Sequence, residues 1–384
     1  MRYATEKIII NPQHPVKQAG HLQQVNPVSK VNDDLSAHIF ALETENNIFI
    51  NISCDVLGFT YDYTEEIKKQ VKNAFDKDIY LVLSATHTHY SGDTTDKTYH
   101  QQLIGQIVQA IKQLHFNDGN LSYTYRSVPY EEVGTSRISN HKALVILNLL
   151  EIFDNDQEII NIINYNCHPT ILSADNTDFF SAEYVGYCLN LLNEENKCFN
   201  TFWQGAAGDV SCRFTRKGQT YDDVKELGTK LFNKIEQLKN QPATHYPLNS
   251  FTLTEKVIPV NIDLNEIDLS ALPKNLSPRE METIGFGKIM RQKIQNHQRV
   301  LQKEMILTKL DLKHVKIIFA PNELFSYYLS LVNDHNTILV CYSNGYSPYV
   351  TPINEMLLTY ETFLDVLDHQ TKQELVDTLK NFAG

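Results

Sequence analysis

The chain has 384 residues and a hydrophobic content of 42%, which leaves room for one large or two ordinary globular domains. Its formal net charge of -12 argues against a nucleic-acid or anionic-membrane partner, because both require a basic surface. No apolar run approaches the roughly 18 residues that a membrane span requires. The first residues also lack the apolar core of a secretory signal.

The six cysteines form no CxxC pair, and several of them follow or lie within apolar runs. This pattern is typical of reduced thiols, so we expect a cytoplasmic protein. The alternative is a secreted protein whose signal has been removed.

Strands and amphipathic helices alternate through the first part of the chain. Residues 47–52 and 79–85 form the apolar runs of buried strands, whereas residues 62–75 and 99–115 carry apolar side chains at helical spacing. This alternation predicts an α/β fold of layered mixed β-sheets flanked by helices, with strands that are at least partly parallel.

The alternation continues toward the C-terminus, and unusual polar residues repeatedly follow the strands. If these strands are parallel, the polar residues share one edge of the sheet, where ligands bind in open α/β folds. The further elements expected are strands at 159–166, 199–203, 315–319 and 337–342 and helices at 182–193 and about 224–238.

The stretch from about 255 to 313 differs from the rest of the chain. Residues 255–264 resemble a strand, and residues 278–304 are polar, contain six Lys/Arg and predict a long exposed helix. We interpret residues 265–313 as a helical insertion, a lid or an oligomer contact. Because no repeat, low-complexity tract or linker interrupts the chain, we expect residues 1–384 to form a single large catalytic domain.

Two of the expected strands run into histidine. The strand at 79–85 leads into His87 and His89, and the strand at 159–166 leads into His168. Catalytic zinc sites commonly gather ligands from separate elements and keep one position open for water. The alternative is a set of hydrogen-bonded loop histidines, and the residues alone leave both interpretations open.

Three other segments permit a functional and a structural interpretation. The small residues before Ser211 allow backbone amides to approach an oxyanion, although Asp209 or Ser211 can equally cap a helix. Glu323 opens a helix, where a carboxylate suits the helix dipole or a metal ion. A C-terminal tyrosine cluster can pack in the core, ligate metal or donate to an oxyanion. Its members are Tyr342, Tyr346, Tyr349 and Tyr360.

Taken together, these segments resemble the neutral/alkaline non-lysosomal ceramidase family. Six motifs occur in the family's order and span about residues 40 to 365, so the resemblance covers nearly the whole chain. The matching segments are Ser84–Gly92 (SATHTHYSG), Asn166–Thr170 (NCHPT), Ser181–Gly186 (SAEYVG), Gly205–Ser211 (GAAGDVS), Pro321–Phe325 (PNELF) and Tyr349–Pro352 (YVTP) followed by Tyr360.

The resemblance implies one zinc ion per chain and a set of site residues. The implied zinc ligands are His87, His168, Glu323 and Tyr349; the implied catalytic residues are His89, Ser211 and Tyr360. Our hypothesis is that metal-activated water attacks an N-acyl amide carbonyl, with Tyr360 stabilising the oxyanion and His89 carrying the proton to the leaving amine. Ser211 is either a nucleophile or a support. Four protein ligands plus water exceed the usual number for catalytic zinc, so Tyr349 is a loose ligand in this scheme.

The sequence also departs from the family pattern. Tyr90 is inserted after the two histidines, Asp93 and Cys212 stand where prolines are expected, and Arg137 is the candidate for the family's arginine. The chain ends before the C-terminal β-domain of the longer ceramidases.

We therefore expect a small-molecule N-acyl amide or lipid-like substrate, as in sphingolipid metabolism. Two alternatives stay open: a zinc hydrolase of a small polar amide or ester, and a non-catalytic zinc-binding protein on the same scaffold. The oligomeric state is not predicted.

Overall fold

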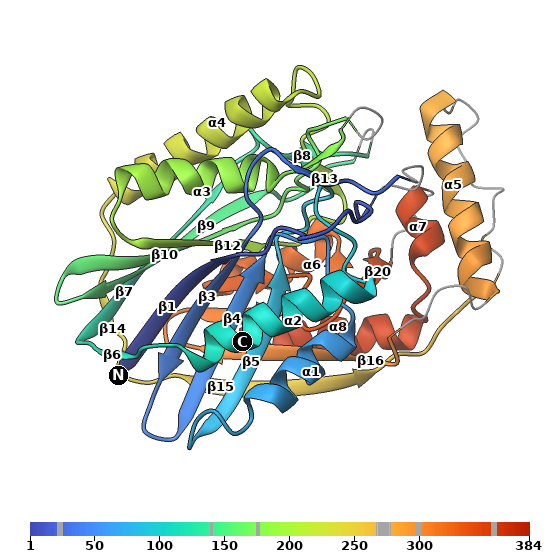
Figure 1. Cartoon of the computed structure of the whole chain (residues 1–384). Helices are drawn as coiled ribbons and strands as arrows, with labels where there is room; N and C mark the ends of the chain where they lie inside the picture. Colours follow the sequence, from blue (N-terminus) through green and yellow to red (C-terminus); the bar gives the residue numbers. More distant parts are fainter. Residues whose placement is uncertain are drawn as a thin grey trace.

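The computed structural model is a mixed α/β structure in which three larger sheets carry the core (Figure 1). The expected α/β fold of layered mixed sheets flanked by helices is confirmed. The structure describes residues 1–20, 26–138, 141–173, 177–265, 267, 276, 278–296, 302–354 and 359–384.

The first sheet has the strand order β5-β4-β3-β1-β6. Strands β4 and β5 are parallel, and the pairs β3/β4 and β1/β3 are antiparallel. Its strands are β1 (Arg2–Ile9), β3 (Ser36–Glu43), β4 (Asn47–Cys54), β5 (Asp78–Ala85) and β6 (Asn117–Asp118).

The second sheet has the order β12-β10-β9-β7-β14, in which β10 and β12 are parallel. Its strands are β7 (Leu121–Pro129), β9 (Ile146–Asp154), β10 (Gln157–Tyr165), β12 (Phe199–Gln204) and β14 (Tyr246–Pro247).

The third sheet has the order β15-β16-β17-β19, with β17 parallel to β19. The expected parallel pairing thus occurs once in each sheet. Three two-stranded pairs add to these sheets: β2/β11, β8/β13 and the parallel pair β18/β20. The strands concerned are β15 (Thr252–Pro259), β16 (Glu304–Asp311), β17 (Lys316–Phe319), β19 (Thr337–Val340), β2 (Lys30–Val31), β11 (Phe179–Phe180), β8 (Thr135–Ser136), β13 (Val210–Ser211), β18 (Asn322–Leu324) and β20 (Ser347–Val350).

The inner faces of the three sheets meet in one aromatic cluster. Phe49 of β4 lies 5.9 Å from Phe319 of β17, measured between ring centroids, and Phe319 lies 5.3 Å from Trp203 of β12. Because successive side chains of a strand point to opposite faces, the neighbours Ile48 and Ile50 face the helices outside instead. The sheets are therefore packed on both faces.

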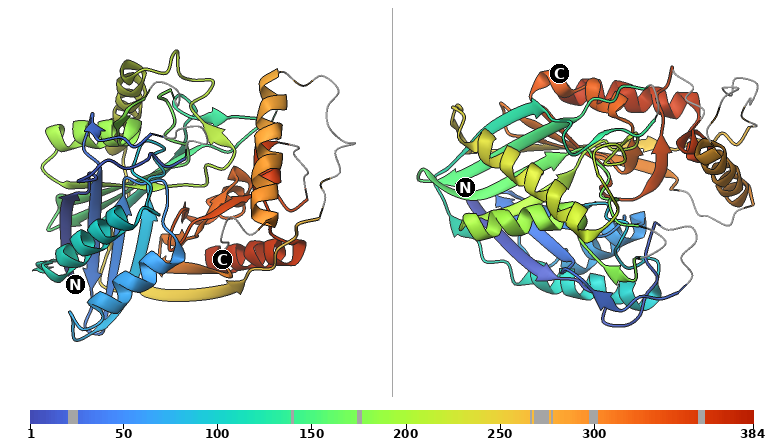
Figure 2. Two further views of the ribbon diagram at one scale, coloured as in Figure 1. Left: turned by 45° about the vertical axis from the view of Figure 1, so that its right-hand side comes forward. Right: turned by 90° about the horizontal axis from the view of Figure 1, so that it is seen from above.

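Helices α1 to α4 and α8 flank the sheets, whereas α5 stands to one side of them (Figures 1 and 2). Helices α1 and α2 lie on the first sheet and α3 and α4 on the second, while α8 lies against β15 and β17 and α5 packs on α7. The helix bounds are α1 (Tyr61–Val71), α2 (Lys97–Lys112), α3 (Glu183–Glu195), α4 (Tyr221–Lys239), α5 (Pro278–Gln295), α6 (Ser326–Ser330), α7 (Tyr360–Leu364) and α8 (His369–Ala383), with a 3-10 turn at Asn333–His335.

The long helix expected over 278–304 is too long at its C-terminal end. Helix α5 ends at Gln295, and Glu304 already begins β16, the second strand of the third sheet. Residues 305–308 are all buried between β15 and β17, so the pattern there is that of a buried strand. The expected strand at 255–264 also begins and ends earlier, as β15. The interpretation of residues 265–313 as an insertion or lid stays a prediction, and part of that range lies outside the described residues.

All six cysteines are unpaired in the structure. Within the described ranges, no helix is long and apolar enough to cross a membrane.

Candidate metal centre

His87 lies just beyond the end of β5, on a sharply turned backbone. Its φ of 67° is in the left-handed region, which is uncommon for a residue with a Cβ and marks a strained position. The backbone N–H of His87 donates to the carbonyl of Val56, and its ring Nδ1–H donates to the carbonyl of Leu57 at 2.7 Å. The segment after β4 therefore fixes the ring of the residue that follows β5.

His168 is held in the same manner by a different loop. It follows β10, and both its backbone N–H and its ring Nδ1–H point at the carbonyl oxygen of Val210, the latter at 3.0 Å. The ring is fully buried. A residue of β13 thus orients the histidine that β10 delivers.

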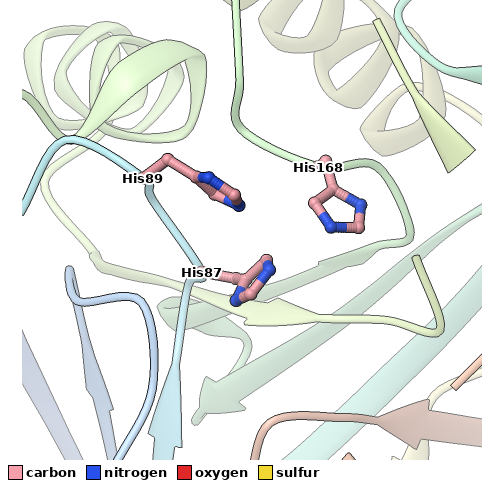
Figure 3. Close-up of side chains that lie close together, drawn as sticks. All are labelled: His87, His89 and His168. Carbon is pink, nitrogen blue, oxygen red and sulfur yellow. The ribbon is translucent and has the colours of Figure 1, made fainter. Parts of the chain in front are cut away.

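The three histidines converge, as Figure 3 shows. One ring nitrogen from each of His87, His89 and His168 lies within 4.8 Å of the others. The centroid of the His87 ring lies 4.8 Å from that of His168 and 5.0 Å from that of His89. Gly20 passes directly over His89: a Cβ at this position, where φ is +79°, would lie 2.6 Å from His89 Nδ1.

Glu323 joins the three histidines from a third segment of the chain. It lies in β18, and its Oε1 is 2.7 Å from Nε2 of His168 and 3.4 Å from Nε2 of His87. The other oxygen, Oε2, accepts a hydrogen bond of 2.9 Å from the hydroxyl of Tyr346. The carboxylate is 1% exposed, so it is paired with imidazoles and a phenol and not with water.

The charges in this cluster depend on one another. Burial raises the pKa of the Glu323 carboxyl, but the adjacent His87 and His168 outweigh it and hold that pKa well below its ordinary value. Burial and the nearby Arg137 guanidinium lower the pKa of His168, even though Glu323 acts in the opposite direction. An ionised carboxylate thus faces a histidine that resists protonation.

A divalent cation fits this arrangement. Backbone carbonyls only accept hydrogen bonds, so Nδ1 of His87 and of His168 must carry the proton, which leaves the neutral Nε2 with a lone pair. Both Nε2 atoms face Glu323 Oε1, which lies within hydrogen-bond distance of His168 Nε2, and no hydrogen-bond partner is found for His87 Nε2 among the described residues. Histidines with Nδ1–H bonded to a carbonyl and Nε2 directed inward are typical metal ligands.

Tyr349 lies beside Glu323 because their strands pair directly. In the parallel pair β18/β20, Glu323 is opposite Tyr349. The guanidinium of Arg137 lies 5.2 Å from the centroid of the Tyr349 ring and is anchored by Glu361 at 2.7 Å and by the Gly208 carbonyl at 2.6 Å. Burial alone would lower the pKa of Arg137, but Glu361, Tyr349 and Glu323 raise it, so the cation is permanent.

Tyr360, the first residue of α7, packs edge-on against Tyr349 with the ring centroids 6.0 Å apart. Tyr349 therefore lies between Glu323, which it pairs with in the strand register, and both Arg137 and Tyr360, which contact its ring. Their roles as ligand and oxyanion donor stay predictions.

Ser211 is joined to the site through its backbone, which forms a parallel bridge with His168. Its hydroxyl accepts a hydrogen bond of 3.3 Å from the backbone N–H of Arg213, a bond typical of a local turn. Asp209, in the same loop, accepts from the N–H and the hydroxyl of Ser326 at 2.6 and 2.7 Å. This loop therefore bonds to the start of α6 through Asp209 and to His168 through Val210 and Ser211.

Tyr342 and Tyr346 have no separate role in the sequence-based prediction, yet both touch the cluster. Tyr342 stacks on His87 with the ring centroids 4.1 Å apart at 25°, and Tyr346 binds Glu323. The backbone oxygens of Leu57 and Val210 were not predicted either, because a carbonyl has no signature in the sequence.

The comparisons with known proteins identify the fold. The sequence matches neither a protein family model nor a curated protein. Among solved structures, the neutral ceramidase from Pseudomonas aeruginosa is similar, with a TM-score of 0.76 and 14% identity over 100% of this chain and 74% of that chain. A ceramidase complexed with C2 is similar too, with a TM-score of 0.76, 13% identity and the same coverage. The chain therefore has the fold of the neutral ceramidases.

Proposed function

We propose that this protein is a zinc-dependent hydrolase that cleaves an N-acyl amide bond. The observation that carries the proposal is the convergence of His87, His89, His168 and Glu323 in a chain with the neutral ceramidase fold. Ceramidases cleave an amide, and the ends of β5, β10 and β18 supply the residues that such chemistry requires.

The proposed zinc ligands are the Nε2 atoms of His87 and His168 and the carboxylate of Glu323, with Tyr349 as a further, looser ligand. A bound zinc ion lowers the pKa of water and polarises a carbonyl group. Glu323 neutralises charge at the site, and the Leu57 carbonyl keeps the ring of His87 in the required tautomer.

Two further groups complete the proposed reaction. His89 accepts a proton and donates it to the leaving amine, while the hydroxyl of Tyr360 donates to the developing oxyanion. Because His89 is near enough to the other rings to act as a third imidazole ligand, its role needs a direct test. Loss of activity with full zinc content in His89→Ala supports the proton carrier, whereas loss of zinc makes His89 a ligand.

The substrate is proposed from the fold at a coarser level. The ceramidase fold favours a lipid-like N-acyl amide, and a small polar amide or ester is the alternative. The discriminating experiment incubates the protein with a fluorescent N-acyl sphingosine and a panel of short N-acyl amines, with and without a chelator. Turnover of only the short amides identifies the alternative, and turnover that resists the chelator contradicts a zinc mechanism. Tightly held zinc without any turnover indicates a binding protein.

We also propose that α5 supports α7, the helix that carries Tyr360. The guanidinium of Arg291, on α5, is buried and donates to the carbonyls of Phe363 and Asp365 at the end of α7, at 3.4 and 3.2 Å. Those two bonds use Nη1, and the second terminal nitrogen, Nη2, donates to the carbonyls of Asp263 and Asn265 at 3.0 and 2.8 Å. Since α7 begins at Tyr360, an insertion containing α5 would hold that residue in place.

A further inference from the structure

Tyr342 occupies a central place between the elements that form the metal centre. Its backbone N–H donates to the carbonyl of Asn322 at 3.4 Å, next to Glu323, and its carbonyl accepts from the N–H of Ala85 at 3.1 Å, at the end of β5. Its φ of 55° lies in the left-handed region, which is strained for a residue of this size. Such strain persists where the surroundings impose it, and it is concentrated at functional sites.

The hydroxyl of Tyr342 has an unusual environment. The side chain is 1% exposed, and no hydrogen-bond partner is found for its oxygen within the part of the chain that the structure describes. A buried hydroxyl normally has a partner, because burying it without one is costly. The ring of Tyr342 lies 4.1 Å from that of His87 and 6.3 Å from that of Tyr346, measured between centroids, so the side chain lies at the candidate centre and not in the remote core.

The other fully buried tyrosines show what such a hydroxyl normally binds. Each of them donates to a main-chain carbonyl. These residues are Tyr63, Tyr90, Tyr99, Tyr123, Tyr165, Tyr184 and Tyr328, and their acceptors are the carbonyls of Thr94, Leu172, Ile10, Leu312, Tyr130, Cys167 and Thr351, respectively. The acceptor that Tyr342 lacks is thus, by analogy within this molecule, the oxygen of an amide.

Stacking of a tyrosine on a histidine is not in itself a feature of the site. A second tyrosine–histidine pair, Tyr246 and His314, has nearly the same arrangement, with the ring centroids 4.1 Å apart at 21°. That pair lies at a surface hollow of about 420 Å³, and His314 is exposed. Tyr246 therefore provides a matched control for the loss of a hydroxyl from a stacked ring.

We propose that Tyr342 is a further catalytic residue, whose hydroxyl donates a hydrogen bond to the carbonyl oxygen of the amide substrate. This inference rests on the proposed amide hydrolase function. The stack against His87 places the hydroxyl beside the zinc ligands, where an amide carbonyl about to be attacked must lie. It adds a donor to the oxyanion stabilisation that we assign to Tyr360.

The test compares Tyr342→Phe with Tyr246→Phe and Tyr165→Phe in the full chain. With the N-acyl amide that the wild type hydrolyses best, kcat/KM of Tyr342→Phe should fall about 100-fold. Its zinc content should remain that of the wild type, because the stacked ring is kept, and Tyr246→Phe should retain full activity.

Stability provides a readout that is independent of activity. Tyr165→Phe loses a hydrogen bond to the Tyr130 carbonyl and should unfold at lower urea, whereas Tyr342→Phe loses no internal bond and should unfold at the wild-type midpoint or above it. A midpoint for Tyr342→Phe as low as that of Tyr165→Phe, or an unchanged kcat/KM beside an active wild type, overturns the assignment. A wild type that hydrolyses no amide refutes the proposed function itself, and the role of Tyr342 with it.

Discussion

Two sets of buried carboxylates lie near the loop that carries His87, and they respond to burial in opposite ways. Glu323 is held ionised, with its pKa well below the ordinary value. Burial instead raises the pKa of Asp55 and of Glu183 to about 7 each, and the hydrogen bonds that they accept offset this effect only in part. All three side chains are at most 2% exposed, so burial alone does not distinguish them.

The difference lies in the partners. Glu323 faces two imidazoles and the hydroxyl of Tyr346. Asp55 accepts from the N–H of Ser36 and the hydroxyl of Thr86, and Glu183 accepts from backbone amides. Neutral donors satisfy a carboxylate without supplying charge, whereas facing imidazoles create a site that a cation completes. Carboxylates of equal burial thus differ in their partners, and only Glu323 has those of a candidate metal site.

Replacing His168 by Ala should have the largest effect, because it leaves Glu323 with a single imidazole. We expect loss of bound zinc and a fall in hydrolytic rate of about 1,000-fold or more. Elemental analysis and amide turnover measure the two effects. His314→Ala, at the surface, is the control and should change neither. Full zinc and full activity in His168→Ala would contradict the assignment of the centre.

Replacing Glu323 by Gln removes the charge from the site and nearly preserves its shape. We expect a zinc affinity lower by about 100-fold, because the amide is a weaker ligand and places a donor beside an imidazole or the hydroxyl of Tyr346. Zinc titration against a competing chelator gives the affinity. An unchanged affinity would mean that Glu323, like Asp55, only accepts hydrogen bonds that hold neighbouring segments together.

Replacing Glu183 by Gln tests the hydrogen bonds that hold the loop after His168. The Glu183 Oε1 accepts from the amides of Ile171 and Leu172 at 2.7 and 2.8 Å, and its Oε2 accepts from that of Tyr184 at 3.3 Å. A Gln side chain directs an NH2 group at one of these N–H groups, so stability should fall by about 1 to 3 kcal/mol. The loop after His168 should loosen, and zinc affinity should fall about tenfold.

Urea unfolding and zinc titration of the same Glu183→Gln sample separate these two effects. A zinc affinity equal to that of the wild type would confine Glu183 to stability alone.

Replacing Asp55 by Asn should have the smallest effect on the site and a clear effect on pH dependence. The pKa of Asp55 is raised from 3.8 to about 7 in the folded chain, so the folded state holds this proton more tightly than the unfolded state. The resulting stabilisation is complete below about pH 4 and is lost as pH rises through about 7, a difference of up to about 4 kcal/mol. Asn keeps an acceptor for Ser36 and cannot ionise.

The gain of Asp55→Asn over the wild type should therefore be larger at pH 8 than at pH 5, as measured by urea unfolding. Asp222→Asn is the control, since its side chain is 90% exposed. A gain that is equal at both pH values would show that Asp55 does not titrate in this window.

Much of the fold and the two histidine loops were predictable, because their signal is local. The apolar runs before His87 and His168 are the buried parallel strands β5 and β10, and the helical spacing in α1 to α4 is real. The predicted helix over 278–304 extends beyond the end of α5, because the polar residues before Glu304 give no sign that a buried strand begins there.

The rest of the centre depends on contacts between distant segments. Nothing in the sequence near Glu323 indicates that β18 pairs in parallel with β20 and so places Tyr349 beside it. The left-handed backbone at Tyr342 is likewise imposed by tertiary contacts, since a bulky residue does not favour it. Motif resemblance supplied Glu323 and Tyr349, but only the structure reveals the carbonyls that orient the rings.

The most direct test of the metal centre is a zinc titration of the chelator-treated protein monitored by calorimetry. We expect one zinc ion per chain, bound with release of heat in the wild type and not in the double variant His87→Ala/His168→Ala. A wild type that binds no zinc, or a double variant that binds it equally well, would show that these histidines do not form a zinc site.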